Sequence, residues 1–239
     1  MRVGIVSSVV ANPAAGLDEL VDEVRSAETD GFAFVSLPNI FGIDAITALA
    51  IAGRETSRIE LATGVVPSPP RHPVALAQQA LTAQAAARGR FVLGIGLSHK
   101  VVIEDMLGLS YDHPAKQMRE YLEVLMPLLR GEPVDFGGDP CTAKPGFSVT
   151  GAPRVRVLVA ALGPHMLRVA GRLADGTATW MTGTRTLAEL TVPTIAKAAA
   201  DAGRPAPRIV AALPVALAKD AAAAREAAGK IFSIYGSLP

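Results

Sequence analysis

Short runs of apolar residues alternate with longer amphipathic stretches along almost the whole chain. Most of the runs are continuous rather than alternating, which is typical of strands buried on both faces of a sheet. They cover residues 3–7, 33–37, 59–66, 91–96, 155–160, 176–181 and 209–217. Each run therefore predicts a parallel strand.

The stretches between these runs predict helices. Leu17, Leu20, Val21, Val24 and Ala27 recur at helical spacing, and Asp44 is placed to cap a helix that reaches residue 52. Prolines suit the first turn of a helix, so further helices are expected over residues 73–86, 114–129, 164–174 and 193–202, with a last one over 221–232. Pro127 falls inside the 114–129 pattern, where we expect a kink or a break.

Strand and helix alternate without a polar linker, which favours one α/β domain over residues 1–239 with a parallel sheet covered by helices. The fold class expected is a TIM (β/α)8 barrel. Seven strand–helix units can be counted where a closed barrel needs eight, so the eighth strand is expected to be missing from this chain. An open doubly wound sheet is the alternative. Residues 131–153 are rich in Gly and Pro and predict an excursion, with a hairpin as one form of it.

Charge and composition narrow the class of protein. Lys and Arg number 23 against 22 Asp and Glu, which argues against a nucleic-acid binder, and 50% hydrophobic residues argue against disorder. The single cysteine, Cys141, cannot form an internal disulfide, so a cytoplasmic location is expected. The apolar N-terminus resembles a signal peptide weakly but is read as a first strand, and no run reaches the roughly 20 residues of a membrane span.

In such barrels the chemistry sits in the loops that follow the strands. The third loop contains Thr63-Gly64-Val65, where glycine would let a flat ring lie against the backbone; a plain turn is the alternative. The fourth contains Gly94-Ile95-Gly96-Leu97-Ser98-His99, which lacks the third glycine of a dinucleotide fingerprint. His99 is a candidate acid or base, and an ordinary loop histidine is equally compatible.

The fifth loop runs Ala160-Ala161-Leu162-Gly163-Pro164-His165-Met166 into a proline-started helix. Free amides at that helix end favour an anion such as a phosphate, although the loop geometry alone would explain these residues. The four histidines and Cys141 show no metal-ligand spacing, so no metal site is predicted.

Taken together, these segments resemble the bacterial-luciferase-like family of flavin- and deazaflavin-dependent oxidoreductases, most of all its actinobacterial members that use coenzyme F420. The resemblance rests on Asp30-Gly31-Phe32 with Ser36-Leu37-Pro38, Ile59 to Val66, Arg71 to Ala77, Gly89 to Gly96, Met118 to Leu122 and Ala174-Asp175-Gly176. It covers nearly the whole chain in the family's order.

The resemblance implies a TIM barrel that holds the cofactor at its C-terminal mouth, over a non-proline cis peptide at Gly64-Val65. It also implies that Gly96 to His99 flank the ring and that Ala161 to Met166 hold the phosphate side. The cofactor-binding residues expected are Ser7, Pro38, Thr63, Gly64, Val65, Gly96, Leu97, Ser98, His99, Ala161, Leu162, Gly163, Pro164, His165 and Met166. His99 is the candidate catalytic residue, as a proton donor.

The function implied is F420-dependent hydride transfer to or from a small organic substrate. An FMN-dependent monooxygenase and a non-catalytic cofactor-binding relative are the alternatives. Two departures bear on the choice. Asn39-Ile40 stands where many relatives have Asp-His, and Leu97 stands where deazaflavin sugar-phosphate dehydrogenases have glutamate, which makes sugar-phosphate oxidation an unfavoured activity. Ile40, Phe41, Trp180 and residues 137–150 are expected to line the substrate pocket, and the family implies a homodimer.

Overall fold

The parallel strands pair one after another around a nearly closed barrel in the computed structural model, which describes residues 1–9, 12, 14–138, 142–143 and 146–233. The strand order is β1 (Ile5–Val6), β2 (Phe34–Leu37), β3 (Glu60–Thr63), β5 (Phe91–Gly96), β8 (Arg156–Ala160), β9 (Gly176–Trp180) and β10 (Arg208–Ala212). A doubly wound sheet reverses its strand order at a switch point. This order never reverses, so the barrel prediction is confirmed and the doubly wound alternative is wrong.

One seam of the barrel is unsealed. Within the described residues β1 pairs with β2 alone and β10 with β9 alone, so these two strands face each other without a ladder between them. Val6 on β1 is consequently 40% exposed although it belongs to a strand. The open seam agrees with the expectation that the eighth strand is missing. Residues 234–239 lie outside the described part of the chain.

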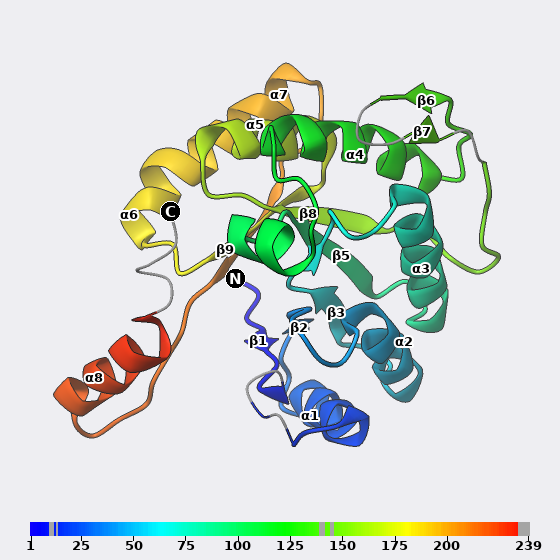
Figure 1. Cartoon of the computed structure of the whole chain (residues 1–239). Coiled ribbons are helices and arrows are strands. Elements are labelled where there is room, and N and C mark those ends of the chain that lie inside the picture. Colours follow the sequence, from blue (N-terminus) through cyan, green and yellow to red (C-terminus); the bar gives the residue numbers. More distant parts are fainter. Residues whose placement is uncertain (10–11, 13, 139–141, 144–145, 234–239) are drawn as a thin grey trace.

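Helices cover the outside of the sheet (Figure 1). They are α1 (Leu17–Thr29), α2 (Ala45–Glu55), α3 (Pro73–Ala86), α4 (Pro114–Leu128), α5 (Pro164–Leu173), α6 (Thr184–Thr186), α7 (Val192–Asp201) and α8 (Ala221–Ile231). Four of the five predicted apolar positions of α1 are buried, whereas Leu17 at its start is 36% exposed. Asp44 caps α2 by accepting from the amide of Thr47 at 2.9 Å. Figure 1 shows α8 set apart from the other helices.

The alternation of side chains along the strands creates two separate apolar clusters. On β8, Val157 and Val159 pack outward into the main core beneath the helices. Leu158 points the other way and joins Ala62, Val92 and the partly buried Val210 in a small cluster inside the barrel. The two clusters stay apart because neighbouring residues of a strand face opposite sides of the sheet.

Charged side chains occupy the inner face at the N-terminal end of the strands. The Glu60 carboxylate lies 2.5 Å from Arg208, 3.3 Å from Arg2 and 3.7 Å from Arg156. The Arg208 guanidinium also lies 5.5 Å from the centre of the Phe34 ring, a cation–π contact. An ion cluster therefore closes this end of the barrel, and the C-terminal end is left for ligands.

The predicted strand over 59–66 is wrong as a single element. The chain leaves the ladder after Thr63 and returns as β4 (Val66–Pro67), which pairs with β5 at Ile95 and Gly96. The strand predicted over 209–217 is also too long, since β10 ends at Ala212. Its partner β9 ends at Trp180, opposite Ala212, so residues after Ala212 have no strand residue of β9 to pair with.

Two prolines behave differently from the sequence prediction. The helix over 114–129 does not break at Pro127, which lies in the last turn of α4, and the amide of Leu129 still donates to the carbonyl of Leu125 at 3.0 Å. The helix predicted from Pro193 starts earlier, at Thr184, and runs through a π-helical turn, Leu187–Thr191, into α7. The wider turn ahead of Pro193 suits a residue that has no amide hydrogen to donate.

The excursion over 131–153 contains the expected hairpin. β6 (Phe136–Gly137) pairs antiparallel with β7 (Thr142–Ala143). Cys141 and the rest of 139–141, like 144–145, lie outside the described residues. The sequence did not predict the helical segment after β5, whose π-helical part is Val102–Met106.

Candidate active site

The loop between β3 and β4 forms a bulge at the C-terminal mouth of the barrel. Its peptide bond Gly64-Val65 is cis, as the family resemblance implied. The amide of Gly64 donates to the carbonyl of Leu37 at 2.9 Å, and the amide of Asn39 donates to the carbonyl of Val65 at 3.4 Å. The neighbouring strand β2 and its loop therefore hold both sides of the bulge.

Glycine is required under this bulge by close approach of other atoms. A Cβ on Gly64 would lie 2.0 Å from Oγ of Ser36, and one on Gly94 would lie 2.0 Å from the carbonyl oxygen of Thr63. At Gly96 the nearest atoms would be a methyl of Val65 at 2.8 Å and the Cβ of Ala160 at 3.1 Å. The mouth thus has a floor of bare backbone and small side chains.

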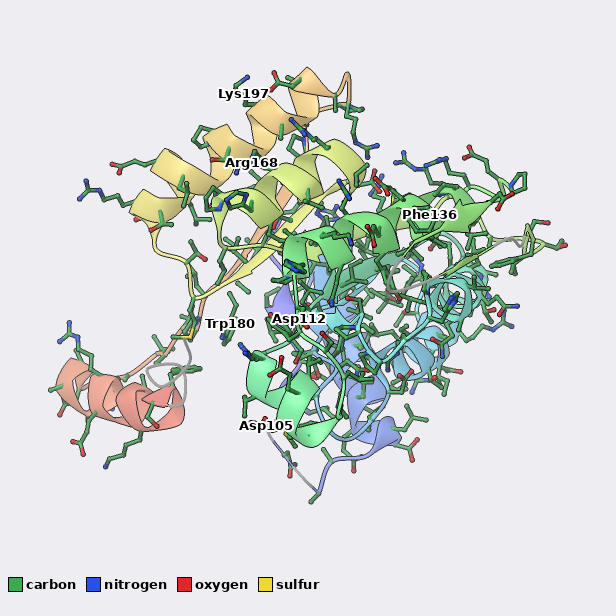
Figure 2. All side chains as sticks on the ribbon, turned by 45° about the horizontal axis from the view of Figure 1, so that its top comes forward. Asp105, Asp112, Phe136, Arg168, Trp180 and Lys197 are labelled. Atoms are coloured by element: carbon green, nitrogen blue, oxygen red, sulfur yellow. The ribbon has the colours of Figure 1, made fainter. Side chains whose placement is uncertain are left out.

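The segment after β5 lies beside this floor. Leu97 is buried, Ser98 has a left-handed backbone with φ of 62°, and His99 is exposed. The carbonyl of His99 accepts from the amides of Val102 and Ile103, each at 3.0 Å, and so begins the helical segment marked in Figure 2 by Asp105. The backbone of His99 is therefore held in place by the start of this helical segment.

Tyr111 supports this segment from the far side of the helical turn. Its hydroxyl donates to the carbonyl of Ser98 at 3.0 Å, and burial raises the pKa of the Tyr111 phenol above its ordinary value. The phenol thus stays protonated, and able to donate, into strongly alkaline solution. Sequence reasoning missed Tyr111, because no local pattern links it to Ser98.

The loop after β8 ends at the N-terminus of α5. Gly163 is the N-cap residue and Pro164 occupies the first turn, as predicted. His165 is exposed, and its Nδ1 lies 2.9 Å from Nη2 of Arg168, one turn further along the helix (Figure 2 labels Arg168). The helix end, with its dipole, thus gains a guanidinium, which adds to its preference for an anion. Arg168 was missed, although its spacing of three from His165 on a helix is a recognisable signal.

The other residues of this loop take different positions. Ala161 is buried, Leu162 is 58% exposed and Met166 is half-buried. The loop therefore presents an apolar side chain, Leu162, at the surface.

Ser7 and Pro38 complete the predicted set at the ends of β1 and β2. Ser7 is buried, and its hydroxyl donates to the carboxylate of Glu23 on α1, which also accepts from the amide of Ser8 at 2.8 Å. Pro38 is half-buried directly after β2. The hydroxyl of Ser7 is thus engaged by Glu23, and its amide donates to the carbonyl of Ser36 at 2.8 Å.

A cavity of about 190 Å³ adjoins Leu97 between β4, α3 and α4. Its lining includes Arg71, His72 and Tyr121, whose hydroxyl donates to the carbonyl of Arg71 at 2.9 Å. Arg71 lies 3.0 Å from the Asp44 carboxylate. Burial alone would raise the pKa of Asp44, but hydrogen bonds from Thr47 and the charge and hydrogen bond of Arg71 lower it below its ordinary value. A fixed ion pair therefore stands beside the cavity.

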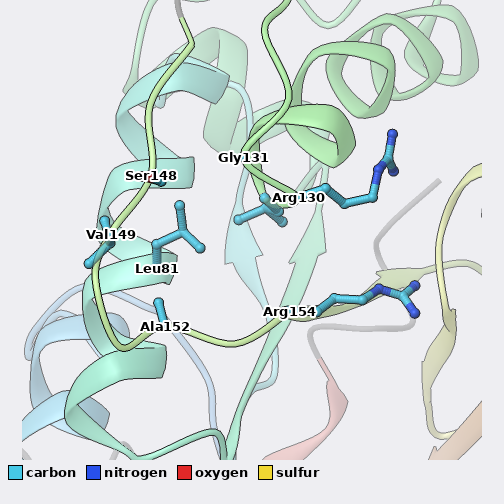
Figure 3. Close-up of a pocket in the computed structure, with 8 residues that line it drawn as sticks. Leu81, Arg130, Gly131, Ser148, Val149, Ala152 and Arg154 are labelled. Atoms are coloured by element: carbon cyan, nitrogen blue, oxygen red, sulfur yellow. The ribbon is translucent and has the colours of Figure 1, made fainter.

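The structure does not bring the predicted substrate-pocket residues together. Ser148 and Val149, from the predicted segment 137–150, line a different cavity with Leu81 and Leu129 (Figure 3). Ile40 and Phe41 are 60% and 66% exposed on the loop after β2. The Trp180 ring, labelled in Figure 2, meets the Phe232 ring edge-on with 6.1 Å between centroids. The structure therefore gives the rim an apolar character but brings Trp180 to the C-terminal segment rather than to Ile40.

Among the described residues, no group of three or more His, Cys, Asp and Glu side chains is arranged to hold a metal ion. Likewise, none of the helices in this part of the chain combines the length and apolar character needed to span a bilayer.

Comparison with known proteins shows which family the chain resembles over nearly its whole length. The profile described as "luciferase-like monooxygenase" matches residues 1–237. An uncharacterized protein of Mycobacterium tuberculosis is 31% identical over 211 residues, which cover 82% of this chain and 62% of the relative. The chain thus spans less than two thirds of the length of that relative.

Two solved structures resemble the whole fold. The coenzyme F420 dependent tetrahydromethanopterin reductase of Methanopyrus kandleri has a TM-score of 0.80 and 25% identity, covering 98% of this chain and 72% of its own. The monooxygenase RslO1 of Streptomyces bottropensis has a TM-score of 0.78 and 26% identity, covering 96% of this chain and 76% of its own. Both likenesses extend over nearly all of the present chain.

Proposed function

This chain belongs to the luciferase-like monooxygenase family, and on that premise we propose that it is an F420-dependent oxidoreductase acting on a small organic substrate. The observation that carries the proposal is the backbone floor made by Gly64, Val65 and Gly96 at the mouth. A flat ring system can lie against such a floor, whereas any larger side chain at Gly64 or Gly96 would collide with atoms already there. The ring of a deazaflavin and the ring of a flavin would fit over this floor equally well.

The residues around the floor suit the remainder of such a cofactor. The amides of His165 and Met166, together with Arg168, would hold its phosphate, because a helix N-terminus and a guanidinium both favour an anion. Leu97, Ser98 and His99 would flank the ring on the side of β5. When bound, the deazaflavin supplies hydride transfer, and the protein orients it and excludes water.

His99 is the proposed proton donor of the reaction. The residue is exposed at the mouth, its backbone is fixed by the hydrogen bonds to Val102 and Ile103, and histidine is the side chain that most often acts as a general acid. We assign it to the oxygen or nitrogen of the substrate that gains a proton as the neighbouring carbon gains a hydride. The apolar rim at Ile40 and Phe41 favours an apolar substrate.

F420 is favoured over FMN by the likeness to the Methanopyrus reductase, which is named for that coenzyme. An FMN-dependent monooxygenase is the second candidate, favoured by the comparable likeness to RslO1. A homodimer in the cytoplasm stays a prediction.

The test is a fluorescence titration of the protein with F420 and, separately, with FMN. We expect saturable F420 binding and weak FMN binding. Tight FMN binding without F420 binding, with oxygen consumption in the presence of reduced FMN, would establish the second candidate instead. Binding of neither would refute both.

The role of His99 is tested with His99→Asn. We expect the rate of hydride transfer to fall about 100-fold, within the usual range for a general acid. The matched control is His113→Asn, since His113 is exposed and left-handed, a backbone state that Asn tolerates. Equal effects of the two variants would remove His99 from the mechanism.

A further inference from the structure

The segment between β5 and α4, residues 98–113, begins and ends with an unusual backbone conformation. Ser98 and His113 are both left-handed, with φ of 62° and 48°, although neither is a glycine. Residues with a Cβ disfavour this region, so the surrounding structure has to hold them there. At His113 the start of α4 does so, because the His113 carbonyl accepts from the amides of Lys116 and Gln117 at 2.9 and 3.0 Å. Ser98 lies outside the helices and strands, so its conformation needs another support.

Tyr111 provides a support for Ser98 from the other end of the segment. Its hydroxyl donates to the Ser98 carbonyl at 3.0 Å, across 13 residues of sequence. The Tyr111 ring is half-buried and packs against the main core, which restricts the positions that its hydroxyl can take. The bond therefore ties the start of the segment to its end, next to the fixed turn at His113. Figure 2 labels Asp105 in the helical part of this segment and Asp112 beside the turn.

Apolar packing holds the segment at one point more than along its length. Ile103 is fully buried, whereas Val101, Met106, Leu107 and Leu109 are exposed. Burial of apolar side chains is the main force that holds a segment against a protein core. The position of residues 98–113 therefore depends on Ile103 and on hydrogen bonds, among them the bond from Tyr111.

The conformation of Ser98 decides where the residues after it lie. His99 is the next residue, and its carbonyl accepts from the amides of Val102 and Ile103, each at 3.0 Å. If Ser98 returned to an ordinary negative φ, the direction of the chain after it would change. His99 and the helical turn would then leave their place at the end of β5.

We infer that Tyr111 is a positioning residue, whose hydroxyl holds Ser98 in the left-handed conformation and thereby fixes His99 at the mouth. Tyr111 acts through Ser98 and needs no contact with a ligand. Its consequence for catalysis rests on the proposed role of His99, and its consequence for cofactor binding rests on the proposed place of residues 97–99 beside the ring. The positioning itself depends on neither.

Hydrogen exchange of single backbone amides tests the positioning without any cofactor. Tyr111→Phe keeps the ring and removes only the hydroxyl, so it should speed the exchange of the Val102 and Ile103 amides about tenfold, through loss of one hydrogen bond. Tyr121→Phe is the matched control, since Tyr121 is also buried and its hydroxyl donates to the Arg71 carbonyl at 2.9 Å. Unchanged exchange in Tyr111→Phe, or an equal increase in both variants, would overturn the inference.

A second substitution separates positioning from a general contribution to stability. Glycine adopts left-handed conformations without strain, so Ser98→Gly added to Tyr111→Phe should restore most of the protection lost at Val102 and Ile103. A hydroxyl that only stabilised the fold could not be replaced by a glycine 13 residues away. Exchange as fast in the double variant as in Tyr111→Phe would therefore overturn the role assigned to Ser98, and the inference with it.

The effect on the site is measured by the fluorescence titration with F420. Tyr111→Phe should raise the Kd about tenfold, whereas Tyr121→Phe should keep it within about twofold of the unaltered protein. If the unaltered protein does not bind F420, the proposed function fails, and the exchange data still decide the role of Tyr111. If F420 binds with the same Kd to all three proteins, Tyr111 does not position the site and the inference fails while the proposed function stands.

Discussion

The hydroxyl of Thr63 donates to the carbonyl of Gly94 and accepts from the amide of the same residue, each at 2.8 Å. These bonds occur where the ladder between β3 and β5 stops, after the pair Ala62 and Val92. The side chain thus replaces the backbone partner that β5 loses while the chain forms the bulge at 64–65. The strand β4 then resumes the pairing at Ile95.

Thr63→Val is expected to lower the free energy of unfolding by about 2–4 kcal/mol, because it leaves both a buried N–H and a buried C=O of Gly94 without their partner. Thr63→Ser keeps the hydroxyl and should lose much less. Chemical denaturation of the two variants and the unaltered protein measures the difference. Equal stability of the Val and Ser variants would show that the hydroxyl is not what joins β3 to β5.

Gly94→Ala is expected to cost about 3 kcal/mol or more, since the new methyl would overlap the Thr63 carbonyl, a backbone atom that cannot rotate away. Gly229→Ala is the control, because a Cβ there meets nothing within 4 Å. Thermal unfolding followed by circular dichroism compares the two. A Gly94→Ala protein as stable as the control would contradict the close approach of β3 and β5.

A third prediction concerns Glu28, whose Oε1 accepts from the amides of Ser57, Arg58 and Ile59 at 3.0, 2.6 and 2.9 Å. Burial alone would raise the pKa of Glu28, but these three hydrogen bonds, with the nearby charge of Arg58, lower it below its ordinary value. A carboxyl with a lowered pKa in the folded state stabilises the protein above its unfolded pKa of about 4.3, and this contribution is lost as the pH falls through the folded value.

Glu28→Gln should therefore reduce stability by about 1 kcal/mol at pH 7, a modest amount because the group is partly exposed. The difference from the unaltered protein should shrink as the pH is lowered from 5 to 3. Urea denaturation at several pH values checks this, with Glu226→Gln as an exposed control on α8. A difference that stays constant over that range would show that the ionised form is not what the loop recognises.

Much of the fold follows from local sequence. Strand starts, helix caps such as Asp44 and the prolines that open α3 and α5 are set by short-range preferences, and they were predicted correctly. The errors at residues 64–65 and 213–217 arise from pairing. A run of apolar residues does not reveal where its partner strand ends, and at β10 that end is decided by Trp180 of β9.

In the candidate site, too, some features could be predicted from local sequence and others depend on contacts between distant segments. Its glycines and its loop positions could be predicted from the sequence, because a glycine at a strand end indicates a turn or a close approach of backbone. Glu23, which holds Ser7, and Tyr111, which holds Ser98, could not. Glu23 acts through hydrogen bonds from Ser7 and Ser8, and Tyr111 through one to Ser98; only the packing of the helical segments on the sheet brings those atoms together.

The ion cluster at Glu60 gives a fourth prediction. Its side chain is 10% exposed, so Glu60→Gln leaves Arg2, Arg156 and Arg208 close together without a buried counter-charge, and we expect a loss of about 3 kcal/mol. Added salt should restore part of the loss by screening the arginines. Glu189→Gln, which breaks an exposed pair with Arg185, should change little. Similar small effects of both variants would mean that the cluster contributes no net stability.

The last prediction concerns Arg168, which lies beside the N-terminus of α5 and contacts His165. If the proposed phosphate site is correct, Arg168→Gln should raise the Kd for F420 about tenfold, roughly 1.4 kcal/mol, through loss of a charge-assisted hydrogen bond. The salt dependence of binding should fall as well, because one charge no longer contributes. Arg172→Gln is the matched control, since Arg172 is exposed in the last turn of the same helix. Both variants should keep the melting temperature, so a loss of affinity would report on the ligand rather than on folding. An equal change of Kd in both would point to the overall charge of α5 and would remove the phosphate from its N-terminus.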